Sequence, residues 1–229
     1  MYKNLNISEL KGKKCIFSYS GGKDSILAIY RCVKAGLIPH KLITTYNAEM
    51  NRSLFHGLTE NLLNSVSCSL TIPVHLIKTT GAEYEKSFEK TLAEMKEEGA
   101  EVCVFGDIDI EDHLKWCTER CNNAGIMPFF PLWHENRKKL VYEFINAGFS
   151  ALITIINTEF ISGEFSGKTL SIETADEIEK SGADICGENG EYHTFVYDGP
   201  IFSKKIDYIT HEKISRDKYL IIPLDLDTE

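Results

Sequence analysis

The sequence lacks the features of membrane and secreted proteins. It contains no run of about 20 uncharged residues, which a membrane-spanning helix requires, and residues 1–14 include no apolar stretch typical of a secretion signal. Its seven cysteines are scattered and include no C-x-x-C pair, which favours reduced thiols over a disulfide framework. We therefore expect a cytoplasmic protein with no membrane segment.

Basic residues are few relative to acidic ones. The chain has 25 Lys and Arg against 34 Asp and Glu, and its formal net charge is −9. A large nucleic-acid-binding surface usually shows as clustered Lys and Arg, so we expect no extensive surface of this kind, while a local basic patch stays open. The hydrophobic fraction of 43% over 229 residues is sufficient for a sizeable folded core.

Short apolar runs alternate with amphipathic segments through the first 131 residues. Four amphipathic segments lie between five candidate strands, which are residues 14–19, 41–46, 74–79, 101–106 and 126–130. This alternation is typical of βαβ units, whose strands pair in parallel. We predict an α/β domain over residues 1–131, built on a doubly wound five-stranded parallel sheet.

The pattern changes after Pro131. A further helix is predicted at 135–147 and an apolar strand at 150–156, followed by a stretch rich in Gly, Ser and Glu. From residue 193 onward the sequence resembles short strands separated by turns. We therefore predict a smaller α+β domain over residues 132–229.

The strongest functional signal is a glycine-rich loop between the first predicted strand and the first predicted helix. Its residues are Ser20, Gly21, Gly22, Lys23, Asp24 and Ser25. Two glycines let the backbone approach an anion, the helix N-terminus and a lysine supply positive charge, and two serines supply hydroxyl donors. The loop is neither a Walker A motif nor a dinucleotide fingerprint. It therefore predicts another kind of phosphate site.

The acidic residue of this loop adds a second expectation. Asp24 beside a phosphate would be repelled unless a divalent cation lies between them, so we predict Mg²⁺ held partly by Asp24. The alternative is an ordinary glycine turn followed by a helix cap from Ser20 or Asp24. The six-residue run resembles the PP-loop of the ATP pyrophosphatases, the adenine nucleotide α-hydrolase-like group. This resemblance implies ATP binding and attack at the α-phosphate with loss of pyrophosphate.

Three further segments resemble the diphthine–ammonia ligase family. They are VFGDI at 104–108 with Trp116 and Cys121 downstream, PLW at 131–133, and CGENGEYHTFVYDGPIF at 186–202. The resemblance implies an enzyme that amidates the carboxylate of diphthine, a modified histidine on elongation factor 2. It also implies ATP and ammonium as substrates and AMP and pyrophosphate as products. Family members often carry an acidic residue where His193 stands, so the acceptor is left open.

Amidation requires positive charge to bring anions together and a base to keep the amine neutral. Lys23 and an Asp24-bound Mg²⁺ can supply the charge. We assign the turn-like run 187–193 to the acceptor and ammonium side, with the base left open among three residues. These candidates are Glu188, Glu191 and His193.

Two residues end the fourth predicted strand, at the sheet edge where ligands of open α/β sheets bind. Gly106 would approach the nucleotide, and Asp107 would contact ribose, metal or acceptor. The negative charge of Asp107 could instead only stabilise the N-terminus of the following helix. Nearby acidic residues and His113 more simply form a solvated surface than a metal site, because no full ligand set follows.

Other conspicuous residues are better explained by packing. Cys117 and Cys121 continue an apolar helical stripe, and Trp116 and Trp133 suit buried positions. Cys186 is interpreted as structural, because no group that would activate a thiol is evident. Lys168 could meet a phosphate or an acidic acceptor, or be a solvated loop lysine.

Three functions are compared. The first is an ATP-dependent amide ligase acting on a carboxylate. The second is a tRNA-modifying PP-loop enzyme, which the net charge and the absence of C-x-x-C disfavour. The third is a non-catalytic adenine-nucleotide-binding protein, which the presence of both Lys23 and Asp24 makes less attractive.

Overall fold

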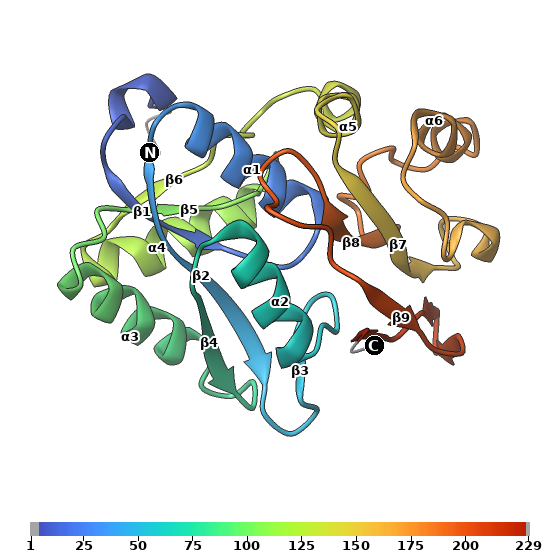
Figure 1. The fold of residues 1–229 in the computed structure, drawn as a ribbon, viewed down its shortest axis with the longest axis horizontal. Helices are drawn as coiled ribbons and strands as arrows, with labels where there is room; N and C mark the ends of the chain where they lie inside the picture. The colour runs from blue at the N-terminus through green and yellow to red at the C-terminus, as the bar shows by residue number, and fades with distance from the viewer. Residues whose placement is uncertain (1–4, 228–229) are drawn as a thin grey trace. The chain divides into compact units, whose positions relative to one another are not determined.

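A computed structural model describes residues 5–227 and divides into two compact units (Figure 1). Residues 1–4, at the start of the N-terminal stretch considered above, and residues 228–229 lie outside the described residues. Of the described residues, the first unit comprises 5–20, 24–54 and 71–134, and the second comprises 21–23, 55–70 and 135–227. The two units thus interleave along the sequence. The predicted division after residue 131 stays a prediction.

The first unit is built on a sheet with five parallel strands. Their spatial order is β4-β2-β1-β5-β6, and a two-residue strand β3 adds antiparallel to β2. The bounds are β1 (Lys14–Ser18), β2 (Ile38–Asn47), β3 (Arg52–Ser53), β4 (Val74–Thr79), β5 (Val102–Val104) and β6 (Met127–Phe129). The predicted parallel sheet is confirmed. Its strand order reverses at β1, which lies between β2 and β5, and ligands of open α/β sheets bind at such a switch point.

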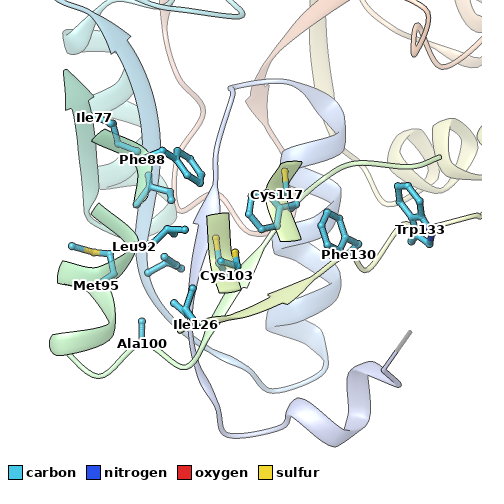
Figure 2. Packing of buried hydrophobic residues seen from close by; sticks show 14 residues of the cluster. Ile77, Phe88, Leu92, Met95, Ala100, Cys103, Cys117, Ile126, Phe130 and Trp133 are labelled. Atoms are coloured by element: carbon cyan, nitrogen blue, oxygen red, sulfur yellow. The ribbon is translucent and has the colours of Figure 1, made fainter. Parts of the chain in front are cut away.

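One face of this sheet carries a large apolar cluster. Figure 2 shows Phe88, Leu92 and Met95 of α3 (Tyr84–Glu97) packed with side chains of the sheet. Helix α4 (Glu111–Ala124) contributes two cysteines to the same cluster, as predicted, and burial raises the pKa of Cys117. Trp133 also packs there, whereas Trp116 stacks on Tyr84 with ring centroids 5.1 Å apart.

The opposite face of the sheet carries a second buried set, because neighbouring side chains of a strand point to opposite faces. Ile16 of β1 belongs to the cluster above, whereas Cys15 and Phe17 are buried outside it. Burial, and secondly the nearby Cys15, raise the pKa of the Cys32 thiol on α1 (Lys23–Lys34). Helices therefore cover both faces, which confirms the doubly wound architecture.

The second unit is α+β. Strands β10-β11-β7-β8 form an antiparallel sheet, and β9 and β12 form a separate pair. The strands are β7 (Ser150–Asn157), β8 (Tyr192–Asp198), β9 (Tyr208–Thr210), β10 (Ile214–Arg216), β11 (Tyr219–Ile221) and β12 (Leu224–Leu226). The helices are α2 (Glu60–Leu70), α5 (Arg137–Asn146) and α6 (Ile172–Lys180), and two 3₁₀ turns are η1 (Ile7–Leu10) in the first unit and η2 (Gly163–Phe165) in the second.

Two features of the second unit differ from the sequence interpretation. Helix α2 contacts β12 within this unit, although its sequence position suggested a helix of the parallel-sheet domain. Helix α6 is absent from the sequence prediction, because its segment lies in the Gly-, Ser- and Glu-rich stretch, whose composition indicates no helix. Ser171 caps α6 by accepting the Thr174 N–H at 3.2 Å, and Ala175 and Ile178 are buried. No helix among residues 5–227 is both long and apolar enough to span a bilayer.

Replacement of Leu92 by alanine tests the importance of the α3 face. Leu92 has no exposed surface, so Leu92→Ala should lower the free energy of unfolding by about 2–5 kcal/mol through lost burial and the cavity left behind. Urea denaturation followed by circular dichroism measures this change. Lys90→Ala on the same helix is the control, because the Lys90 side chain is 80% exposed. Equal stability of the two variants would contradict the packing described.

Candidate functional site

The glycine-rich loop, residues 20–25, begins directly after β1 and runs into α1. Within the first unit, the Ser20 hydroxyl donates to the Ser25 hydroxyl across the loop, with the oxygens 3.3 Å apart. The Thr44 hydroxyl of β2 donates to the Tyr19 carbonyl at 2.8 Å and fixes the backbone immediately before the loop. Asp24 lies in the first turn of α1 and is half-buried.

Gly106, just after β5, lies directly against the start of α1. A Cβ at this position would lie 2.8 Å from the Asp24 carbonyl carbon and 2.8 Å from the Ser25 nitrogen. Such a contact with backbone atoms is too short, so only glycine permits this approach. The structure therefore brings Gly106 beside Asp24 and Ser25, while its predicted approach to the nucleotide stays a prediction.

Asp107 follows Gly106 and contacts a histidine. The His113 Nδ1 lies 3.2 Å from an Asp107 carboxylate oxygen, and His113 is exposed, as predicted. Asp107 is half-buried at the carboxyl end of β5. Its functional role stays a prediction.

Residues 21–23 of the loop are held by β8 of the second unit. The Val196 N–H donates to the Gly21 carbonyl at 3.0 Å, and the Lys23 N–H donates to the Thr194 hydroxyl at 3.1 Å. Gly21 has φ of 99°, in the left-handed region that favours glycine. The loop conformation thus depends on a strand far away in the sequence.

The Lys23 side chain is buried beside an aromatic ring. Lys23 is only 5% exposed, and its Nζ lies 5.5 Å from the centroid of the Tyr192 ring. A buried ammonium group beside backbone donors is a strong attractor for phosphate, since little water screens its charge. The predicted role of Lys23 in binding phosphate stays a prediction.

His56 is the main residue of this region that sequence reasoning missed. Its Nδ1 donates to the Thr194 carbonyl at 2.7 Å, and its ring centroid lies 4.9 Å from that of His193. The isolated F-H-G sequence before α2 carries no signal that would place the ring beside β8.

Both histidines are held in the neutral state. Burial, the neighbouring His193 and Lys23 together lower the pKa of His56 to about 3, outweighing the opposing hydrogen bond to Thr194. Burial and Lys23 lower the pKa of His193 to about 4. The region beside Lys23 thus contains two neutral imidazoles at pH 7.

The loop before β8 is organised by two carboxylates. The buried Glu191 carboxylate accepts the Asp184 N–H at 3.2 Å, the Asn189 N–H at 3.0 Å and the Asn189 side-chain amide at 3.0 Å. Asp184 accepts from the Glu188 N–H at 2.9 Å and from Arg137 at 2.8 Å. Glu191 therefore holds the loop in shape, and its expected catalytic role stays a prediction, as does that of the half-buried Glu188.

Cys186 and Lys168 also have structural settings. Cys186 is fully buried, and its N–H donates to an Asp184 carboxylate oxygen at 3.1 Å, in agreement with the structural interpretation of this cysteine. Lys168 forms an ion pair with Glu177 at 3.1 Å and lies over the Phe165 ring.

The donor set suits a phosphate ligand and a hard cation. The Lys23 ammonium has the charge that a phosphate ligand requires, and a glycine-rich turn that leads from a strand into a helix is a common phosphate site. Mg²⁺ is typically bound by one or two carboxylates together with substrate phosphates, and Asp24 provides such a carboxylate.

Comparison with known proteins decides the family. Residues 13–128 match the diphthamide synthase N-terminal domain, and residues 136–222 match the diphthamide synthase C-terminal domain. The chain belongs to the diphthamide synthase family. The family resemblance inferred from the sequence is therefore confirmed, and the two matched segments span most of this diphthamide synthase family member.

Curated relatives of this diphthamide synthase family member are named diphthine–ammonia ligase. The Homo sapiens protein is 26% identical over 216 residues, covering 82% of this chain and 79% of the relative. The Danio rerio protein is 27% identical, covering 82% and 83%. A solved structure from Methanocaldococcus jannaschii, described as a predicted subunit of tRNA methyltransferase, is 17% identical with a TM-score of 0.44 and covers 84% of this chain and 100% of its own.

Substitution of Gly106 tests its close approach to α1. Gly106→Ala should lower the free energy of unfolding by about 1–3 kcal/mol, because the new methyl group meets the Asp24 and Ser25 backbone. Hydrogen exchange at the start of α1 should become faster. Gly163→Ala is the control, because its Cβ would meet only the end of the Leu220 side chain, at 3.3 Å. Similar stability for both variants would refute the contact.

The two neutral histidines predict an acid-sensitive fold. An unfolded histidine has a pKa of about 6.5, so between about pH 6.5 and 4 the unfolded chain binds more protons than the folded one. The free energy of unfolding therefore decreases as the pH is lowered through this range. At about pH 5 the loss should reach up to about 2 kcal/mol per histidine. Urea unfolding measured from pH 7 to 5 gives the slope. The double variant His56→Asn, His193→Asn should have a shallower slope, and an unchanged slope would contradict the burial of these rings.

Proposed function

We propose that this chain is an ATP-dependent amide ligase that adenylates a carboxylate and amidates it with ammonia, giving AMP and pyrophosphate. The observation that carries the proposal is the glycine-rich loop with its buried Lys23, in a chain whose curated relatives are named diphthine–ammonia ligase. A tRNA-modifying role has less support, because the matched domains are those of diphthamide synthases.

The chemistry requires two steps. A carboxylate is a poor acyl donor, because direct attack by ammonia would have to expel oxide. In the first step a carboxylate oxygen attacks the α-phosphorus of ATP and the bond to pyrophosphate breaks. In the second, ammonia attacks the acyl carbon, the bond to AMP breaks, and one proton leaves the nitrogen. Each step places negative charge where preorganised positive groups stabilise it.

The glycine-rich loop is assigned to the nucleotide. The Lys23 ammonium would bind the phosphates together with loop N–H groups other than that of Lys23, which is bonded to Thr194, and the Ser20 and Ser25 hydroxyls would add donors. Asp24 would hold Mg²⁺, which neutralises phosphate charge when bound. Asp107, which follows Gly106 after β5, is assigned to the ribose, the metal or the acceptor.

The run 187–193 is assigned to the acceptor and the amine. The base that takes the proton leaving the nitrogen in the second step stays open among Glu188, Glu191 and His193, because the lowered pKa of His193 makes this neutral imidazole a weak base. Glu191 maintains the loop, and Glu188 completes the set of candidate polar groups. The proposed acceptor is the diphthine carboxylate, carried by elongation factor 2 as the family resemblance implies, and the proposed location is the cytoplasm.

Asp24→Asn tests the mechanism. With ATP, Mg²⁺, ammonium and diphthine-bearing elongation factor 2, the native chain should release AMP and pyrophosphate, and Asp24→Asn should reduce this release by about 10²-fold or more because the cation loses its carboxylate. Ion-exchange chromatography of the nucleotides measures the products. Asp112→Asn, an exposed carboxylate on α4, should retain activity.

The outcome of that assay separates the candidate functions. Release of ADP and phosphate would overturn attack at the α-phosphate. ATP binding without turnover on diphthine or on a panel of small carboxylates would favour a non-catalytic nucleotide-binding protein. Turnover on a small carboxylate but not on diphthine would support the ligase activity and would overturn diphthine as the acceptor.

A further inference from the structure

His56 contacts two segments of the site that lie far from it in the sequence, the glycine-rich loop and β8. It lies in segment 55–59, before α2, and its ring reaches both β8 and the glycine-rich loop. None of the roles assigned above uses this residue. Its contacts nevertheless bear on the three loop residues that belong to the second unit, residues 21–23.

The first contact is between the His56 ring and Gly22. A Cβ on Gly22 would lie 2.5 Å from the His56 Cε1 and 3.2 Å from its Nε2. Gly22 is not among the glycines with positive φ, so its backbone conformation suits other residues as well. The ring of His56 is therefore the reason that Gly22 has no room for a side chain.

The second contact passes through Thr194. The Thr194 carbonyl accepts the His56 Nδ1–H at 2.7 Å, while the Thr194 hydroxyl accepts the Lys23 N–H at 3.1 Å. One β8 residue is thus fixed by His56 and itself fixes the loop. Thr194 is buried, so water cannot readily replace either bond.

The His56 ring also adds no positive charge beside Lys23. Since a carbonyl accepts from Nδ1, that nitrogen carries the proton in the neutral ring. Burial, His193 and Lys23 keep the pKa of His56 far below 7, so no second cation forms beside Lys23. His56 can therefore support the loop mechanically without repelling the lysine.

We propose that His56 is a positioning residue for nucleotide binding, which holds residues 21–23 in the conformation that receives the triphosphate. It does so by packing on Gly22 and by fixing Thr194. This inference rests on the proposed function, because it takes ATP as the anion at the loop. We thus expect His56 to affect the affinity for ATP and not the binding of the acceptor or of ammonia.

Three variants separate the hydrogen bond from the bulk of the ring. His56→Asn keeps a donor near the Nδ1 position, whereas His56→Leu keeps an apolar side chain of similar size and removes the donor. His211→Asn is the matched control, since His211 is an exposed histidine of the same unit that lies 2.9 Å from an Asp225 carboxylate oxygen. The probe is a non-hydrolysable ATP analogue with Mg²⁺, titrated by calorimetry.

His56→Leu should weaken binding of the analogue by about tenfold or more, the effect of losing one buried hydrogen bond that orders the site. His56→Asn should stay within about threefold of the native chain, and so should His211→Asn. In the amidation assay, His56→Leu should raise KM for ATP and leave KM for ammonium unchanged. A purely structural defect would instead lower the unfolding temperature and would not be rescued by asparagine.

A double-mutant cycle tests the contact with Gly22. Gly22→Ala should weaken analogue binding about tenfold in the native background, because the methyl group displaces the His56 ring. In the His56→Ala background the same substitution should have an effect of about threefold or less, because the space is then open. If the effects of the two substitutions on binding were additive, the contact with His56 would not be the reason that residue 22 is a glycine.

The binding results separate this inference from the proposed function. If the native chain binds the analogue and His56→Leu binds it equally well, the role of His56 is overturned while the ligase proposal stands. If the native chain binds no adenine nucleotide, both are overturned. If His56→Leu and His56→Asn lose affinity equally and unfold at lower temperature, His56 serves only the stability of the fold.

Discussion

The hydrogen bond from the Lys23 backbone N–H to the Thr194 hydroxyl fixes the conformation on which the rest of the site depends. The two residues are 171 positions apart, and the bond is buried. The loop carries the groups suited to phosphate, yet its glycines make it intrinsically permissive. Anchoring to β8 converts a flexible turn into a preorganised set of donors, and preorganisation is what makes such donors effective toward charge developing in a reaction.

The same strand also sets the electrostatics. Tyr192 lies beside the Lys23 ammonium, His193 pairs with the ring of His56, and Thr194 holds the backbone, so three successive β8 residues all serve this region. Register with β7 shifts between Ile153 and Ile155, opposite this part of β8. Two imidazoles with lowered pKa values lie in this region, so they add no positive charge to that of the lysine at pH 7.

Local patterns predicted much of this structure because they depend on neighbouring residues. The five parallel strands, the glycine-rich loop and the buried cysteines of α4 follow from periodicity and from spacing along the chain. His56 was missed because its partner Thr194 is 138 residues away, and no local pattern encodes that distance. The Glu191 carboxylate holds the loop through bonds from the Asp184 and Asn189 N–H groups, and these depend on a turn geometry that the sequence alone does not specify.

The interleaving of the two units has a consequence for the order of synthesis. The glycine-rich loop leaves the ribosome early, whereas the β8 residue that anchors it is made 171 residues later. A nascent chain that has completed all five parallel strands therefore still has a loop without its anchor. The loop can be anchored only after β8 has been made, so a chain terminated before β8 that retains the parallel sheet would lack the means to hold the loop.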